Sequence, residues 1–298
     1  MQYLKKQNEN NAQRIVWLAI LLILGVGICI YAFLKDSGAK KELTDTSKEQ
    51  NNFDMYQITK MDLLTECENP VMIDLSADSE GGIRIEEAGD YVLSGVSEEA
   101  VVVDAQEQIV HLVLNGADIR SVEGPAIYVK SAGKVIISLA ENTENVVRDS
   151  GNYNHDEKCN AAIYSTADLT INGEGSLFVY GYYKDAIHTK DVLKVVDGNV
   201  YVQAKRNGLR GNDGMVIMPK LLTVESEGSG LQTTNANQEG KGVLNICGGE
   251  ISITAGKYGM VSAADVYISD CNISCLSVMS EIKAEGEEVV EEGCFSYE

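Results

Sequence analysis

The fold is decided by a five-residue pattern that returns at a nearly constant interval: AIYST at residues 162–166, AIHTK at 186–190, GLRGN at 208–212 and GLQTT at 230–234. The intervals between these copies are 24, 22 and 22 residues. Two further copies at wider intervals are AIYVK at residues 126–130 and GMVSA at residues 259–263. A recurring interval of this length predicts a solenoid in which each copy belongs to one coil.

The segments between these copies alternate apolar and polar residues, as half-buried β-strands do. Examples are HLVLNG at residues 111–116, KVIISL at 134–139, DLTING at 168–173 and EISITA at 250–255. Helical periodicity is almost absent beyond the first 34 residues, so we expect an all-β domain. A leucine-rich repeat would need its leucine consensus and helical segments, and a β-sandwich would not keep one period. The pattern therefore predicts a parallel β-helix with coils about 4.8 Å apart.

The chain of 298 residues is strongly acidic. It carries 24 Lys and Arg against 45 Asp and Glu, a formal net charge of −21. Phosphate groups need a basic surface, so this charge argues against nucleic acid as a partner.

Residues 15–34 (IVWLAILLILGVGICIYAFL) form a run of 20 residues without a charged side chain. A helix of that length spans about 30 Å, the thickness of the hydrocarbon core of a bilayer. We expect an N-terminal transmembrane helix, with residues 1–14 as a short cytoplasmic head and the large domain outside the cell. The alternative is a cleaved signal peptide, but the run is longer than usual and no A-x-A site follows.

The remaining chain divides by composition. Residues 35–60 are polar and rich in Asn, Lys, Asp and Glu, which favours a flexible stalk. Residues 61–280 hold the strand pattern and form the predicted β-helix domain. Residues 281–298 contain seven Glu and one Lys and are expected to be a frayed acidic tail.

Six segments resemble, in chain order, a carbohydrate-binding family of Gram-positive bacterial surface proteins: GDYVLSG at 89–95, VHLVLNGADI at 110–119, GPAIY at 124–128, NAAIY at 160–164, LTINGEGSL at 169–177 and DAIHTKD at 185–191. The resemblance covers about residues 86–275. It implies a right-handed parallel β-helix similar to that of polysaccharide lyases. It also implies binding of cellulose and of acidic sugars such as polygalacturonate, with calcium in the coils.

The resemblance implies calcium ligands at turns that read Asp-Gly-Ile in the family. The corresponding turns here read Asp185-Ala-Ile, Asn207-Gly-Leu, Ser229-Gly-Leu and Tyr258-Gly-Met. Calcium prefers six to eight oxygen ligands, several of them anionic, so most of these turns are poor sites. One weak calcium site remains as a prediction, built from Asp185, Asp191, Asn207 and Asp213. The alternative is that these residues cap β-turns.

Residues 184–220 hold seven Lys and Arg against four Asp, a net charge of +3 in an acidic domain. Because consecutive coils stack, we expect these charges to lie close together. Arg206 and Arg210 can each donate paired hydrogen bonds to a uronate carboxylate, and Lys184 and Lys205 would add positive charge. The segment predicts a basic patch for an acidic polysaccharide. The alternative is a solvated face that offsets neighbouring acidic residues.

Aromatic residues cluster at the same level of the chain. Phe178, Tyr180 and Tyr182 alternate with inward residues, and the register places Tyr201 opposite Phe178. Sugars stack their C–H faces on such rings, so these four residues are candidates for carbohydrate binding. The alternative is an external ladder that merely packs. The only Trp, Trp17, lies in the predicted anchor, which argues against a flat platform for crystalline cellulose.

The histidines and cysteines match no known catalytic or metal motif. His111, His155 and His188 are scattered and form no zinc motif, and His188 beside a turn is expected to be structural. The pairing of Cys67, Cys159 and Cys294 stays open.

These observations predict a membrane-anchored, extracellular protein of a Gram-positive-type bacterium that binds a polysaccharide without cleaving it. One alternative is a calcium-assisted polysaccharide lyase, for which Lys190, Lys205 and Arg210 are the candidate bases and charge-stabilising groups. The other is a structural or adhesive surface β-helix without sugar binding, for which the replaced turn aspartates argue.

Overall fold

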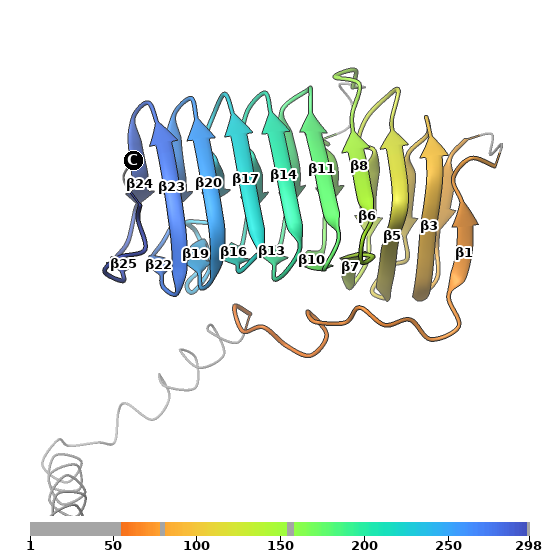
Figure 1. Ribbon diagram of the computed structural model, residues 1–298, viewed down its shortest axis with the longest axis horizontal. Helices are drawn as coiled ribbons and strands as arrows, with labels where there is room; N and C mark the ends of the chain where they lie inside the picture. Colours follow the sequence, from red (N-terminus) through yellow and green to blue (C-terminus); the bar gives the residue numbers. More distant parts are fainter. Residues whose placement is uncertain (1–54, 78–80, 154–157, 297–298) are drawn as a thin grey trace, which may run out of the picture. The chain divides into compact units, whose positions relative to one another are not determined.

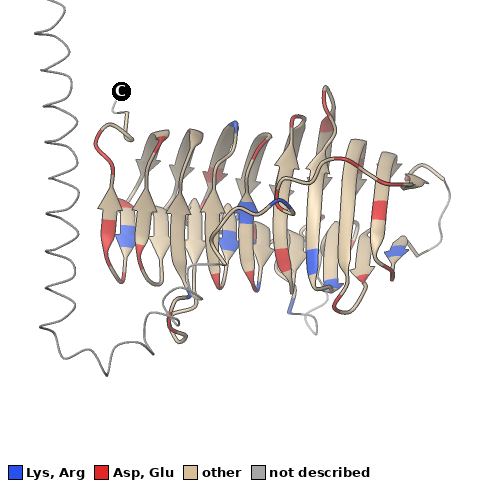
Figure 2. Ribbon diagram, turned by 90° about the horizontal axis from the view of Figure 1, so that it is seen from below, with Lys and Arg blue, Asp and Glu red and all other residues tan. Residues whose placement is uncertain are grey.

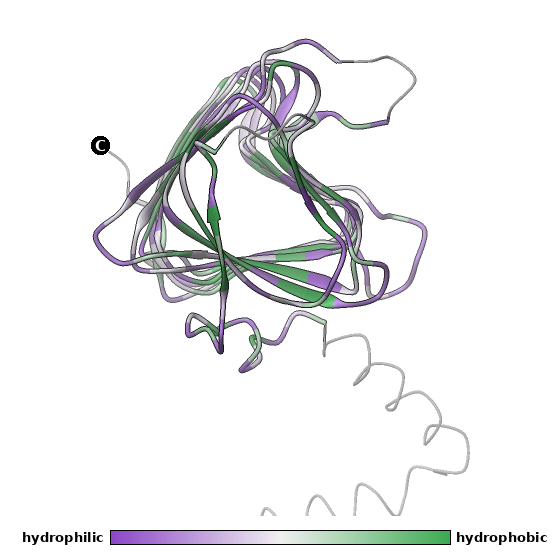
Figure 3. Ribbon diagram, turned by 90° about the vertical axis from the view of Figure 1, so that its right-hand side faces the viewer, coloured by the Kyte–Doolittle hydropathy of each residue, from purple (hydrophilic) through white to green (hydrophobic). Residues whose placement is uncertain are grey.

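The computed structural model describes residues 55–77, 81–153 and 158–296, and these form stacked coils of β-strand (Figure 1). Every strand pairing among them is parallel, and the strands make one sheet of 16 and one of nine. Viewed along the coil axis, three faces enclose a triangular cross-section (Figure 3). The predicted all-β parallel β-helix is confirmed.

The strands of the three faces follow one another in each coil. Face 1 consists of part of β5 (Ile109–Arg120), β8 (Glu144–Arg148), β11 (Ser176–Gly181), β14 (Asn199–Ala204), β17 (Leu221–Ser226), β20 (Gly249–Ala255) and β23 (Cys271–Ser277). Face 2 consists of the rest of β5, β7 (Lys134–Leu139), β10 (Asp168–Gly173), β13 (Val192–Val195), β16 (Gly214–Ile217), β19 (Val243–Ile246), β22 (Val266–Ile268) and β25 (Glu288–Val290).

The nine-stranded sheet is face 3. It consists of β2 (Ile83–Ile85), β4 (Val101–Asp104), β6 (Ile127–Ser131), β9 (Ala161–Ser165), β12 (Asp185–Thr189), β15 (Leu209–Gly211), β18 (Leu231–Thr233), β21 (Tyr258–Ser262) and β24 (Ser280–Ala284). The first coils also contain β1 (Val71–Asp74), which pairs with β3 (Gly89–Ser97), which in turn pairs with β5.

The core is a stack of aliphatic ladders inside the coils. Leu177 pairs with Val200, and Val200 pairs with Leu222, so one buried position repeats along face 1. All three side chains are fully buried. Because side chains alternate across a strand, their neighbours in sequence point outward to the surface.

An insertion between β8 and β9 covers the outer surface of face 3. Tyr153 is 7% exposed and donates a hydrogen bond from its hydroxyl to the carbonyl oxygen of Ala161, at 2.7 Å. It belongs to a small cluster with Cys159 and Tyr164. Residues 154–157 of this insertion lie outside the described part of the chain.

The N-terminal residues 55–69, which we call the strap, run across the outer surface of face 2 (Figure 2). Tyr56 is 6% exposed and donates a hydrogen bond to the carbonyl oxygen of Asp213 at 2.8 Å. Asp62 is fully buried and pairs with Lys134 and Lys194 at 2.5 and 3.1 Å. The strap explains why Val192 to Val195 are buried on both sides of β13.

The predicted boundaries need two corrections. Residues 55–60 of the predicted stalk belong to the strap, because Tyr56 finds an apolar pocket and buried acceptors on face 2. The predicted acidic tail is not frayed, because β24 pairs with β21 and β25 pairs with β22. Backbone groups at the open edge of a β-helix accept another strand whatever the charge of its side chains.

The predicted anchor, residues 15–34, and its flanks at 1–14 and 35–54 lie outside the described residues. Among the residues that the structure describes, no helix has the length and apolar character needed to cross a membrane.

Candidate functional site

Face 1 carries aromatic side chains on its outer surface. Phe178 of β11 and Tyr201 of β14 are register partners, as the sequence predicts. Their rings stack with centroids 4.7 Å apart and an interplanar angle of 8°. Leu177 and Val179 of β11 are fully buried, so the alternation of the strand directs Phe178 outward.

A second ring pair lies at the end of β11. Tyr180 and Tyr182 have ring centroids 6.0 Å apart and planes 19° from parallel. Tyr182 is 45% exposed. The four predicted aromatic residues therefore share one face, in two adjacent and nearly parallel pairs.

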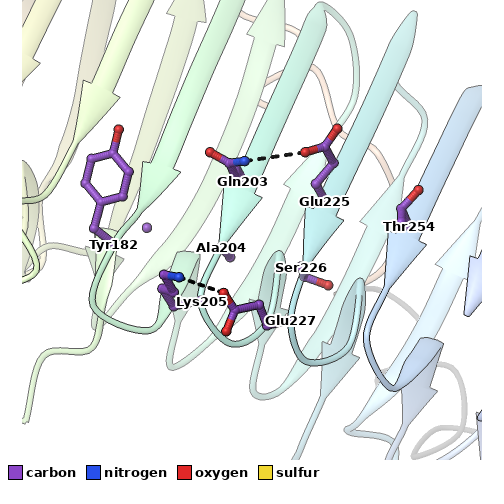
Figure 4. Close-up of a pocket in the computed structure, with 9 residues that line it drawn as sticks. Tyr182, Gln203, Ala204, Lys205, Glu225, Ser226, Glu227 and Thr254 are labelled. Carbon is purple, nitrogen blue, oxygen red and sulfur yellow. Dashed lines mark hydrogen bonds and ion pairs between the residues drawn. The ribbon is translucent and has the colours of Figure 1, made fainter. Parts of the chain in front are cut away.

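Two adjoining hollows follow these rings across the strands. One, of about 290 Å³, is lined by Phe178, Tyr180, Tyr201, Val202, Gln203, Thr223 and Glu225. The other, of about 410 Å³, is lined by Gly181, Tyr182, Gln203, Ala204, Lys205, Glu225, Ser226, Glu227 and Thr254 (Figure 4). Gln203 and Glu225 line both, so the hollows form one continuous surface, which we call the aromatic groove.

The polar side chains of the aromatic groove are held by one another. Gln203 Nε2 lies 3.4 Å from Glu225 Oε2, and Lys205 Nζ lies 2.7 Å from Glu227 Oε1. Figure 4 shows these pairs side by side on neighbouring coils, next to Tyr182. Each position repeats after 22 residues, because Gln203 and Glu225 are register partners.

This arrangement can bind an extended carbohydrate. Rings offer flat apolar surfaces for sugar C–H faces, and the amide and carboxylate groups offer donors and acceptors for hydroxyl groups. The groove crosses four strands, from β11 to β20, which is about 14 Å at the spacing of neighbouring strands. That length suits a short stretch of polysaccharide better than a single sugar.

The predicted basic patch is divided by the fold. Arg206 donates hydrogen bonds from Nε and Nη2 to the two carboxylate oxygens of Asp185, at 2.7 and 2.5 Å. This hydrogen bonding raises the pKa of Arg206. Arg210 lies on face 3, with Nη1 4.0 Å from Asp185 Oδ2. Both guanidinium groups therefore serve a buried carboxylate of the protein itself.

The two lysines of the predicted patch have different surroundings. Lys184 Nζ lies 4.4 Å from the centroid of the Tyr183 ring, a cation–π contact. Lys205 lies in the aromatic groove. Of the four predicted basic residues, Lys205 alone lines the groove.

The three residues considered for a lyase also lie apart. Lys205 lies at the edge of face 1, whereas Arg210 belongs to β15 of face 3. Lys190 follows β12 and lies 6.0 Å from the centroid of the Tyr164 ring. Lys205 and Arg210 therefore do not face one common point.

His188 is buried between two asparagine side chains of face 3. Its Nδ1 lies 2.5 Å from Asn160 Oδ1, and its Nε2 lies 3.1 Å from Asn212 Oδ1. Burial and the nearby positive charge of Arg210 lower the pKa of His188 to about 4. The imidazole is neutral at pH 7 and holds neighbouring coils together.

The four predicted calcium ligands lie in two groups at opposite ends of β12. Asp185 begins the strand and neighbours Asn207, whereas Asp191 follows the strand and neighbours Asp213. Six residues of extended chain span about 20 Å, so one cation cannot bind both groups.

The first group does not fit a calcium ion. Both carboxylate oxygens of Asp185 accept hydrogen bonds from Arg206, and Oδ1 also accepts the backbone N–H of Asn207 at 3.0 Å. A calcium ion would have to displace the guanidinium group. Arg206 thus supplies the positive charge at this corner.

The second group already contains a lysine. Asp213 accepts hydrogen bonds from Asn235 Nδ2 at 2.7 Å and from Lys241 Nζ at 2.5 Å. Burial and the carboxylates of Asp168 and Asp213 raise the pKa of Asp191 to about 6. Asp191 is therefore the carboxyl group of this corner that ionises least readily.

Sequence reasoning missed several groove residues. Gln203, Thr223, Glu225 and Glu227 occupy outward positions of face 1, and the 22-residue register with the aromatic residues could have identified them. The strap was also missed, because it contains no repeat that would reveal its contact with face 2.

Comparisons with known proteins agree with this fold. Residues 79–296 match the model of a family described as carbohydrate-binding domain-containing protein. A protein of that description from Acetivibrio thermocellus is 35% identical over 222 residues, which are 72% of this chain and 78% of the relative. A solved structure, described as the polysaccharide lyase-like protein from C. thermocellum in a gadolinium derivative, is 32% identical with a TM-score of 0.70. That match covers 76% of this chain and 98% of the other. The resemblance drawn from the repeated segments is therefore confirmed, and the chain belongs to the family of carbohydrate-binding domain-containing proteins.

Proposed function

We propose that this protein binds a polysaccharide along the aromatic groove and does not cleave it. The observation that carries the proposal is the pair of ring stacks, Phe178 with Tyr201 and Tyr180 with Tyr182, on the outside of one face. An exposed Tyr such as Tyr182 gains little from packing alone, whereas a bound sugar would cover it.

The charge of the groove favours a neutral polysaccharide. Glu225 and Glu227 line it with Lys205, so its ionisable side chains sum to about −1 at pH 7. Arg206 and Arg210, which the sequence suggested as uronate receptors, are close to Asp185 instead. A polyuronate would meet net repulsion here, and a neutral glycan would not.

Binding in this proposal needs no calcium, because the groove residues lie outside both predicted calcium groups. We further propose that residues 15–34 anchor the protein in the cell membrane of a Gram-positive-type bacterium, with the β-helix outside. The uncharged run of 20 residues supports this placement. Cleavage of the β-helix by a protease added to intact cells would test it.

Affinity electrophoresis tests the binding proposal. The protein is run through gels that contain a neutral soluble glucan, xylan, mannan or polygalacturonate, each with and without chelator. We expect retardation by at least one neutral polysaccharide, unchanged by chelator, and less retardation by polygalacturonate. Phe178→Ala and Tyr201→Ala should each weaken retardation at least tenfold, the loss expected for about 1.4 kcal/mol of stacking.

Tyr258→Ala is the matched control, because it removes a half-buried ring from face 3 and should leave retardation unchanged. Normal retardation of Phe178→Ala and Tyr201→Ala would contradict the groove. Retention by no polysaccharide would favour a structural or adhesive protein. Release of unsaturated, ultraviolet-absorbing products from polygalacturonate would favour the lyase.

A further inference from the structure

Three side chains that can bind a metal ion meet where the strap reaches the first coils. Cys67 comes from the strap, Asp90 from β3 and His111 from β5. His111 Nδ1 lies 2.8 Å from Asp90 Oδ1 and 3.9 Å from Cys67 Sγ. All three ligand atoms lie within 4.8 Å of one another. They are far apart in sequence, so no spacing rule reveals them.

A chain of hydrogen bonds determines which nitrogen of His111 carries the proton. Asn172 donates both amide hydrogens, to the carbonyl oxygens of Asp62 and Leu64, at 2.9 and 2.8 Å. Its Oδ1 therefore faces Ser138 Oγ, 2.5 Å away, and can only accept. Ser138 also has the Leu64 carbonyl oxygen as an acceptor at 3.0 Å.

Ser138 must spend its single proton on one of these two oxygens. Its Oγ is then free to accept from His111 Nε2, which lies 2.7 Å away. The hydrogen of the neutral imidazole is consequently on Nε2, and a lone pair is on Nδ1. This is the arrangement in which histidine binds metal ions, with its other nitrogen donating to a nearby acceptor.

The Nδ1 lone pair and the Asp90 carboxylate face each other at 2.8 Å, and two acceptors at that distance require a positive species between them. Asp90 is also oriented, because its Oδ2 accepts the backbone N–H of Glu68 at 2.8 Å. The positive species is either a second ring proton or a metal ion. The adjacent thiol of Cys67 favours the metal ion, because sulfur adds nothing to a protonated imidazole.

We propose that Cys67, Asp90 and His111 bind a zinc-class divalent cation. Ligand atoms of tetrahedral zinc lie roughly 3.3–3.6 Å apart, and the distances from His111 Nδ1 are within about half an ångström of that spacing. Sulfur and imidazole nitrogen select zinc over calcium and magnesium, which prefer oxygen. Asp90 and Cys67 are partly exposed, so solvent can reach the cation and supply a fourth ligand.

The cation would fasten the strap to the β-helix. Cys67 lies on the strap, whereas Asp90 and His111 belong to adjacent strands of the first coils. A bound ion would thus link three segments that otherwise meet through hydrogen bonds, and would stabilise the folded state in proportion to its affinity. This site lies apart from the aromatic groove, so its test is independent of carbohydrate binding.

Metal titration of the full chain tests the proposal. The protein, stripped of metal and kept reduced with a phosphine, is titrated with Zn²⁺ by calorimetry and with Co²⁺ by absorption spectroscopy. We expect one equivalent of Zn²⁺ to bind, a cobalt–thiolate charge-transfer band, and protection of Cys67 from alkylation when Zn²⁺ is bound. Cys67→Ser should remove the charge-transfer band and weaken Zn²⁺ binding at least tenfold.

Cys247→Ser is the matched control, because Cys247 is also a partly buried free thiol and lies outside the site. It should keep both the stoichiometry and the band. Asp90→Asn keeps the size of the side chain and should weaken binding with the protein still folded. Absence of one-to-one Zn²⁺ binding in the unaltered protein would overturn the proposal in favour of a doubly protonated His111. Unchanged affinity in Cys67→Ser would overturn it equally.

Discussion

Individual buried charges in this protein are matched by partners from distant parts of the chain. Asp185 is fully buried and is held by Arg206 of the next coil. Asp62 of the strap is fully buried and is held by two lysines of face 2. Removing one partner of such a pair leaves a buried charge without compensation, which costs far more than the pair itself contributes.

Asp62→Asn tests this argument at the strap. Burial alone would raise the pKa of Asp62, but hydrogen bonds from Lys134, Thr59 and Thr170 hold it well below the usual range. We expect a loss of about 3–5 kcal/mol in the free energy of unfolding at pH 7, measured by urea titration. Since the folded-state pKa is depressed, this contribution is present above the unfolded pKa of about 3.9 and is lost as the pH falls.

Glu227→Gln is the control for Asp62→Asn, because it breaks the exposed pair with Lys205. We expect it to change the free energy of unfolding by less than about 1 kcal/mol. A similar small effect of Asp62→Asn would show that the strap does not depend on its buried carboxylate.

Asp191→Asn should have the opposite effect. The pKa of Asp191 is raised to about 6 by burial and by the neighbouring carboxylates of Asp168 and Asp213. The folded state therefore prefers the neutral form, and stability is lost as the pH rises from about 4 through 6. The amide of Asn mimics the neutral form. We expect the variant to be more stable than the unaltered protein by about 1 kcal/mol at pH 7, and equal to it below pH about 4.

Thermal unfolding between pH 3.5 and 8 measures this difference. If calcium binds at the corner of Asp191 and Asp213, the unaltered protein should gain stability from added calcium at pH 7, and Asp191→Asn should not. A variant that loses stability at pH 7 without calcium would contradict the assignment of a neutral-preferring carboxyl group.

At the scale of single elements, the corners between strands decide how tightly the coils stack. Gly173 ends β10 with a φ of +91°, and a Cβ there would clash with the backbone of Leu139 in the preceding coil. Gly116, within β5, has a φ of +74° and open space around the equivalent position. The two glycines therefore separate the cost of the backbone conformation from the cost of close stacking.

Gly173→Ala and Gly116→Ala make a matched pair. We expect Gly116→Ala to lower the free energy of unfolding by about 1–2 kcal/mol, the cost of a left-handed conformation in an L-residue. Gly173→Ala should cost clearly more, because neighbouring backbone must also move. Chemical denaturation of both variants measures the difference, and equal losses would show that the coils yield to the added methyl group.

Across the whole molecule, contacts run mainly between neighbouring coils, and the strap is the exception. It contacts β7, β10 and β13 through Asp62, and it reaches β16 and β19 through Tyr56. A solenoid is stabilised by the sum of its coil interfaces. The strap adds a connection along several coils at once, and the proposed metal site would strengthen one end of it.

Truncation after residue 279 tests how the last coil contributes. The deleted residues include β24 and β25, which pair with β21 and β22. We expect the shortened protein to fold, with loss of hydrogen-exchange protection in β21 and β22 and little change in β7 and β10. Unchanged protection throughout would indicate that the last residues fray, as their charge alone suggests.

Much of the architecture could be predicted from the sequence, because a β-helix repeats one local rule. The interval of 22 residues places Leu177, Val200 and Leu222 in one ladder, and the same interval pairs Phe178 with Tyr201. Alternation then decides which side chains point outward. The aromatic pairs were predictable for this reason.

The basic and acidic candidates were less predictable, since stacking brings residues close without stating which partner each will choose. Arg206 and Asp185 were expected to bind a ligand and a cation, and they bind each other. Their distance along the chain is one coil, so the prediction of proximity was right. The roles differ because a buried carboxylate takes the nearest available donor.

The sequence by itself determined the repeat, the inward ladders and the outward rings, because these follow from local alternation and a constant period. Only the tertiary structure decided the contacts of the strap, the pairing of buried charges and the meeting of Cys67, Asp90 and His111. Those contacts join segments that share no period, and their geometry depends on how a non-repeating chain packs against a finished surface. Periodicity is a local property that can be read along the chain, whereas such packing is defined only in three dimensions.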